Sequence, residues 1–248
     1  MEERLRGALI RGVMQAGSVL KKQNGGRRAV WDIERKARDA ILREIKATAP
    51  ALCLWGDRED PESAVSLCPL DSTLNFSREF GEFSVMAAYI EDGRPSFGAV
   101  YLPNSEALFT AERGKGARIE GRKVSAGMRT DLSRALVCCG CDCFLQGEAG
   151  LSPLALDVIS SLSRAGVPWR NSGSAGWDSA ALATGRADGF IAPLMESQHA
   201  AAYLLMEEAG ALVTDGKGEK YTMASRSLVA ANRELHGRLL DILGDALF

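Results

Sequence analysis

The sequence predicts an α/β protein, built as one large domain or two intimately packed lobes, and three observations support this. Its 248 residues, of which 46% are hydrophobic, can bury a sizeable core. The first half begins with helical periodicity and continues as short strands separated by turns. In the second half, strands alternate with helical stretches. We find no internal repeat and no linker that would separate independent domains.

The first half is expected to form two helices followed by a meander of strands. Apolar residues recur at helical spacing over residues 3–20, and again over residues 32–47 before Pro50. An acidic loop follows a short apolar strand, and turn residues such as Gly93 separate the later strands. The expected strands are residues 52–55, 84–90, 96–102 and 107–111.

The second half is expected to alternate strands with helices. Gly185 and Gly210 end two Ala-rich or apolar helical runs, and Asn232 is placed to cap the last helix. The expected strands are residues 136–139, 168–171, 189–192 and 228–231, and the expected helices are residues 153–165, 174–184, 200–209 and a C-terminal segment.

Charge and composition narrow the classes of partner. A formal net charge of −2 supplies no field to attract nucleic acid or an anionic membrane, so we expect neither as a partner. The N-terminus lacks the pattern of a secretory signal, and no apolar run reaches the length of a membrane span. We therefore expect a cytoplasmic protein with reduced cysteines.

The run Leu-Cys-Pro-Leu-Asp-Ser-Thr-Leu-Asn-Phe at residues 67–76 resembles a metal-phosphatase signature. The matching signature, Asp-Pro-Leu-Asp-Gly-Thr-x-Asn-Phe, belongs to the inositol monophosphatase family, which also includes bisphosphate nucleotidases and archaeal-type fructose bisphosphatases. Further segments resemble the family's later elements in the right order: residues 98–103, 111–117, 170–175, 183–188 and 208–211.

This resemblance implies both a fold and an activity. The fold is an alternating α/β/α/β/α layered sandwich, with an α+β lobe over residues 1–134 and an α/β lobe over residues 135–248. The family hydrolyses phosphate monoesters with Mg²⁺ at a site between the lobes. The resemblance also implies that the protein binds a small phosphorylated ligand and forms a homodimer.

The metal ligands implied by the resemblance are only half retained. Two of the four carboxylate positions fall on Asp57 and Asp71, whereas the other two fall on Cys68 and Gln198. Mg²⁺ prefers oxygen ligands, and a thiolate is too soft for it. We therefore expect Mg²⁺ binding to be weak, although Glu59 or Asp60 could compensate for the shorter side chain of Asp57.

Other parts of the implied catalytic machinery persist. Asp32 and Thr73 align with the pair that activates the attacking water, although each could equally be a helix cap. Ser72 and Thr73 are expected to begin a helix whose free N–H groups hold a phosphate. The resemblance also places Gly173, Ser174 and Ala175 beside the substrate. Inositol phosphate itself is in doubt, because Ala192-Pro193 stands where an acidic residue contacts substrate hydroxyls.

Four of the six cysteines are concentrated at residues 138–143. We favour a buried strand filled with small side chains. The alternative is a Zn²⁺ site in which Cys68, Cys141 and Asp71 converge, although their spacing matches no standard zinc motif. His199 and His236 also lack metal-ligand spacing and are expected to be ordinary polar residues.

Two functions remain open at this point. The first is a family member with severely weakened or absent Mg²⁺-dependent phosphatase activity, whose cleft binds a small phosphorylated molecule or whose surface serves assembly. The second is an active, divergent phosphatase acting on a small sugar, inositol or nucleotide phosphate. Loss of two carboxylates favours the first function, and the resemblance over nearly the whole chain favours the second.

Overall fold

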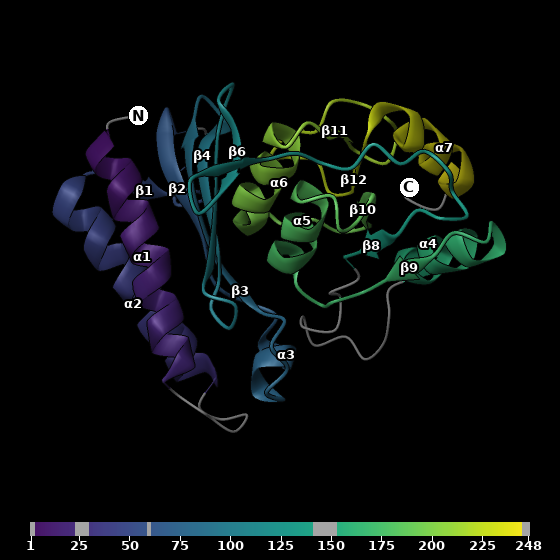
Figure 1. Cartoon of the computed structure of the whole chain (residues 1–248). Helices are drawn as coiled ribbons and strands as arrows, with labels where there is room; N and C mark the ends of the chain where they lie inside the picture. Colours follow the sequence, from purple (N-terminus) through teal and green to yellow (C-terminus); the bar gives the residue numbers. More distant parts are fainter. Residues whose placement is uncertain (1–2, 23–29, 59–60, 141–152, 245–248) are drawn as a thin grey trace.

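A computed structural model describes residues 3–22, 30–58, 61–140 and 153–244, and these form five alternating layers (Figure 1). The two N-terminal helices lie on one outer face, and a seven-stranded sheet follows. Two helices from the second half separate this sheet from a five-stranded sheet, and a last helical pair covers the other outer face. The predicted α/β/α/β/α sandwich is therefore confirmed.

The helices follow the predicted apolar periodicity closely. Each outer helix buries one apolar stripe, whereas α5 (Ala175–Ala183) and α6 (Ala200–Glu208) are buried on most sides because a sheet lies against each face. The helices are α1 (Glu3–Lys21), α2 (Val30–Thr48), α3 (Thr73–Ser77), α4 (Pro153–Arg164), α5 (Ala175–Ala183), α6 (Ala200–Glu208) and α7 (Arg233–Leu243), with a 3₁₀ turn η1 at Ser197–His199.

The first sheet is a meander in which neighbouring strands are also neighbours in sequence. Only the pair β1 and β2 is parallel. Its strands are β1 (Cys53–Leu54), β2 (Ser63–Asp71), β3 (Ser84–Glu91), β4 (Arg94–Leu102), β5 (Ala107–Glu112), β6 (Gly116–Ile119) and β7 (Arg122–Val124).

The second sheet has the order β11-β12-β10-β8-β9, in which β9, β8 and β10 are mutually parallel. Strand β12 is antiparallel to both of its neighbours. The strands are β8 (Val137–Cys139), β9 (Trp169–Arg170), β10 (Gly189–Ala192), β11 (Leu212–Thr214) and β12 (Leu228–Ala231). The two sheets thus divide between residues 124 and 137, while the lobe boundary at residue 134 stays a prediction.

Three hydrophobic clusters fill the spaces between the layers. One lies between the α1–α2 pair and the first sheet, one surrounds α5 and α6, and one joins the second sheet to α4 and α7. The layers approach closely at Gly98 of β4, where an added Cβ would lie 3.0 Å from the Cα of Ala201 in α6. Glycine therefore allows α6 to pack directly on the sheet.

Strand β2, which carries the signature, was not predicted as a strand. Most of its residues are buried, so the alternation of polar and apolar side chains that marks a half-exposed strand is missing. Pro69 also interrupts it, and the pairing with β3 shifts by one residue between Cys68 and Asp71. Such a bulge accommodates a proline and redirects the side chains that follow.

The described helices include none that is both long and apolar enough to cross a membrane. Among the described cysteines, Cys53, Cys68, Cys138 and Cys139 form no disulfide. Cys138 and Cys139 are fully buried in β8, as the strand interpretation of the cysteine cluster requires. Cys141 and Cys143 lie outside the described residues.

Candidate functional site

Asp71 ends β2 and connects the two halves of the chain through one carboxylate oxygen. Its side chain is almost fully buried, with the residue 4% exposed. Its Oδ2 accepts hydrogen bonds from Ser84 Oγ at 2.9 Å, Ser174 Oγ at 2.6 Å and the Gly176 N–H at 2.9 Å. Three donors satisfy this oxygen, as a buried carboxylate requires. Only Oδ1 remains for further chemistry.

The N-terminus of α5 is fitted against this carboxylate. An added Cβ at Gly176 would lie 2.0 Å from Ser84 Oγ, so only glycine lets the helix start this close to β3. The helix dipole favours a negative charge at this end. Ser174 also caps the helix, because its Oγ accepts from the Trp177 N–H at 3.3 Å. Ser174, which was predicted to lie beside the substrate, thus donates its hydroxyl hydrogen bond to Asp71.

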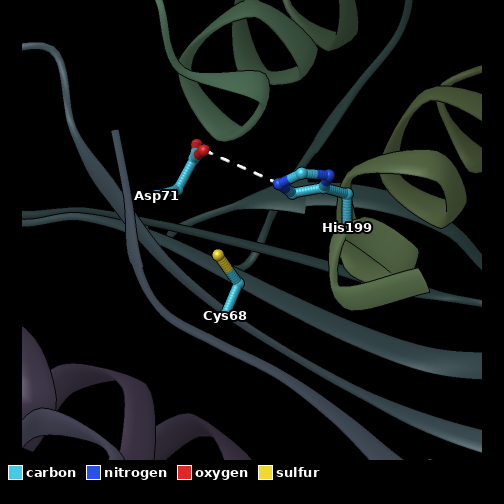
Figure 2. Close-up of side chains that lie close together, drawn as sticks. All are labelled: Cys68, Asp71 and His199. Carbon is cyan, nitrogen blue, oxygen red and sulfur yellow. Dashed lines mark ion pairs between the residues drawn. The ribbon is translucent and has the colours of Figure 1, made fainter. Parts of the chain in front are cut away.

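The other oxygen of Asp71 faces His199 and Cys68 (Figure 2). His199 Nε2 lies 3.8 Å from Asp71 Oδ1. One ligand atom of each residue, Cys68 Sγ included, lies within 4.8 Å of the other two. Cys68 is 2% exposed and the His199 side chain 12% exposed, so the cluster is shielded from solvent.

His199, which was expected to be an ordinary polar residue, lies beside Asp71. The resemblance placed the fourth ligand position on Gln198, but Gln198 Nε2 donates to Glu196 within the same turn. The 3₁₀ turn η1 is held by Ser66 Oγ, which donates to the Ser197 carbonyl at 2.7 Å. Cys68 and His199 are far apart in sequence, so no local spacing could reveal the pair. His236, by contrast, is buried and bonds Thr214 Oγ1 through Nε2 at 2.9 Å.

Asp57 and Asp32 lie outside this cluster. Asp57 is exposed, and its Oδ2 accepts from the Leu54 N–H at 3.3 Å. Asp32 lies in the first turn of α2, where its 67% exposed side chain pairs with Arg35 at 2.9 Å. Glu59 and Asp60 lie outside the described residues.

The predicted phosphate-binding segments are neighbours in space. Asn75 Nδ2 donates to the Ser172 carbonyl at 2.7 Å, which ties α3 to the loop before α5. Ser72 adjoins that loop too, since an added Cβ at Gly173 would lie 3.5 Å from Ser72 Oγ. The structure thus brings together residues 71–75 and 172–176. Thr73, the first residue of α3, is half-buried, and Ala175 begins α5.

Ser72 adopts a left-handed backbone conformation, with φ 71° and ψ 70°. It precedes the first residue of α3, as predicted, but its side chain makes no capping hydrogen bond. Non-glycine residues pay a steric cost in this region. The glycine of the matching family signature avoids that cost, whereas this chain bears it.

A second buried acid, Asp178 in α5, was not predicted. Its Oδ2 is buried without a hydrogen-bond partner among the described residues. Burial raises its pKa from 3.8 to about 7, while hydrogen bonds from Ser172 and Cys138 and the charge of Arg170 oppose the rise and the charge of Asp71 adds to it. Burial and the neighbouring Asp178 also raise the pKa of the Cys138 thiol.

Comparison with known proteins agrees with this architecture. The inositol monophosphatase family matches residues 6–247. Nus factor SuhB from Escherichia coli (strain K12) is 28% identical over 260 residues, covering 96% of each chain. A putative Nus factor SuhB from Neisseria meningitidis is 32% identical over 221 residues, covering 86% of this chain and 84% of the relative.

Solved structures show the same likeness. The extragenic suppressor protein suhB of Bartonella henselae superposes with a TM-score of 0.84 at 28% identity, over 96% of this chain and 98% of that one. An inositol monophosphatase from Anabaena shares the fold with a TM-score of 0.84 at 24% identity, over 96% of this chain and 94% of that one. The chain belongs to the inositol monophosphatase family.

Replacing Ser72 with glycine should stabilise the protein by about 1 kcal/mol, because glycine adopts the left-handed conformation without steric cost. Urea denaturation of the wild type and Ser72→Gly measures the change. Ser77→Gly, within α3, is the matched control and should destabilise by about 0.5–1 kcal/mol. Destabilisation by Ser72→Gly would show that the serine makes a compensating interaction.

Asp178→Asn should change how stability depends on pH. The raised folded-state pKa means that the stability contributed by protonated Asp178 is fully present below about pH 4 and is lost as pH rises through about 7. The variant should therefore gain stability relative to the wild type across this window, by at most about 4 kcal/mol. Denaturation at several pH values measures the difference, with exposed Asp157→Asn as the control. A difference in the free energy of unfolding that stays constant with pH would contradict the raised pKa of Asp178.

Proposed function

We propose that this protein is a family member whose Mg²⁺-dependent phosphomonoesterase activity is severely weakened or absent, and whose cleft binds a small phosphorylated molecule. The observation that supports this most strongly is the state of Asp71. It is the one carboxylate in the cluster, and one of its oxygens is fully engaged by Ser84, Ser174 and Gly176.

The chemistry of the cluster argues against tight Mg²⁺ binding. Mg²⁺ requires near-octahedral oxygen coordination and usually keeps several waters. Cys68 offers sulfur and His199 offers nitrogen, while Asp57 is exposed in its loop. Each lost carboxylate removes an attraction of about 4 kcal/mol for a unit charge at 4 Å and an effective dielectric near 20. The remaining set should bind Mg²⁺ orders of magnitude more weakly.

The segments that would hold a phosphate are nevertheless retained. Residues 71–75 and 172–176 are fixed together by Asn75 and Asp71, which supports a phosphate-binding role for these neighbouring segments at the starts of α3 and α5. Ser72, Thr73, Gly173 and Ala175 are the residues of these segments that we expect beside the phosphate. An active divergent phosphatase remains the alternative. It would need Asp57, Asp71 and Thr73 to hold one metal and one activated water, with Asp32 turned away from Arg35.

Phosphate release from sugar, inositol and nucleotide phosphates with Mg²⁺ or Mn²⁺ tests the proposal. We expect no turnover by the wild type and measurable turnover by Cys68→Asp/His199→Asp, because this double variant places two further carboxylates beside Asp71. Asp71→Ala in the restored background should abolish the gain. Wild-type turnover that Asp71→Ala abolishes would contradict the proposal and establish the active alternative.

The relatives' name supports a second candidate, a role in assembly rather than catalysis. Those relatives are named Nus factors, a name that refers to transcription. It opposes the expectation, drawn from the net charge of −2, that nucleic acid plays no part. An indirect role through RNA polymerase satisfies both observations, because a protein partner needs no basic surface.

Fluorescence anisotropy of the labelled protein distinguishes binding to RNA polymerase from direct binding to RNA. We expect binding to purified bacterial RNA polymerase at physiological salt, and no binding to RNA alone, since a chain with net charge −2 releases few counterions. Affinity for RNA alone that falls steeply with salt would establish direct contact instead. Failure to bind either would remove this second candidate.

A further inference from the structure

Cys68, Asp71 and His199 present three different ligand atoms to one small volume. The atoms lie within 4.8 Å of one another, and Figure 2 shows the three side chains close together, with a dashed line joining Asp71 to His199. Cys68 lies in β2, Asp71 ends β2 and His199 lies in η1. The fold, rather than local sequence, therefore brings His199 to the other two residues. His199 turns Nε2, rather than Nδ1, toward Asp71 Oδ1, so Nε2 is the imidazole atom that can reach an ion shared with Asp71.

We propose that these three residues form a site for Zn²⁺ or a similar borderline-soft divalent ion. Sulfur, imidazole nitrogen and carboxylate oxygen are the three ligand types that Zn²⁺ uses. With Cys68 as thiolate, the protein supplies two negative charges, which balance the ion. This set differs from the sequence-based alternative, since His199 takes the place given there to Cys141. The proposal concerns the metal and does not depend on loss of phosphatase activity.

The distances suit this ion after small side-chain movements. Zn²⁺ bonds of about 2.0–2.3 Å in tetrahedral geometry place ligand atoms roughly 3.3–3.8 Å apart. The observed 3.8 Å between His199 Nε2 and Asp71 Oδ1 lies at this limit. The largest separation in the cluster is at most 4.8 Å, so closing it requires about 1 Å.

Outer contacts already orient two of the ligands. Ser84, Ser174 and Gly176 hold Asp71 Oδ2, which turns Oδ1 toward the cluster. Ser66 fixes the turn that carries His199. Metal sites typically depend on such supporting hydrogen bonds. Three protein ligands leave a fourth position for water, the arrangement of zinc sites that are open to chemistry rather than purely structural.

Titration of the metal-free protein with Co²⁺, followed by Zn²⁺ displacement, tests the site. We expect a thiolate-to-cobalt charge-transfer band and intense tetrahedral visible bands in the wild type. Cys68→Ser should lose the charge-transfer band, and His199→Gln should weaken affinity at least tenfold. Ser174→Ala should weaken it by about 10–100-fold through Asp71 alone. Cys53→Ser, a half-buried cysteine in β1, is the matched control and should match the wild type.

The wild-type spectrum decides the proposal even if a variant fails to fold, and thermal melting checks each variant. No cobalt band at millimolar Co²⁺, or a band that persists in Cys68→Ser, overturns the site. Absence of both this band and Mg²⁺-dependent turnover would overturn the zinc site and leave the proposed function standing. Zinc binding together with Mg²⁺-dependent turnover would support the zinc site and overturn the proposed loss of phosphatase activity.

Discussion

The arrangement of the whole site depends on the buried carboxylate of Asp71. Burying a charge without partners is costly, and here three donors offset the cost. One donor comes from β3 and two come from the start of α5, so the carboxylate holds the second half of the chain against the first sheet. The position of α5 in turn fixes the loop at residues 172–174 beside α3. The relative positions of α3, α5 and the loop before α5 thus depend on one side chain.

This arrangement also explains why the cluster differs from the hard-cation site implied by the family signature. Asp71 directs Oδ2 toward Ser84 and the start of α5, and Oδ1 toward His199 in the cluster that both residues form with Cys68. A sulfur and an imidazole nitrogen, rather than further carboxylates, lie beside Asp71. The family's fold is therefore present here around a different set of side chains.

Helical periodicity and turn residues predicted most of the helices and strands because they are local signals, whereas the layered arrangement was implied by the resemblance to the family. Residues 67–76, which carry the signature, contribute Cys68 and Asp71 to the cluster. His199 could not be predicted, because its approach to Asp71 depends on a 3₁₀ turn that places it, rather than Gln198, beside the cluster. Strand β2 was hidden by burial on both faces and by Pro69. The left-handed Ser72 and the unpaired oxygen of Asp178 likewise arise from tertiary packing.

A double-mutant cycle between Asp71→Asn and Ser174→Ala measures most directly whether the carboxylate joins the two halves. Urea denaturation of the wild type, both single variants and the double variant yields the coupling free energy. The account predicts about 1.5–3 kcal/mol, the range for a hydrogen bond to a charged group. Effects that add to within about 0.5 kcal/mol would show that the two residues are energetically independent, which would contradict it.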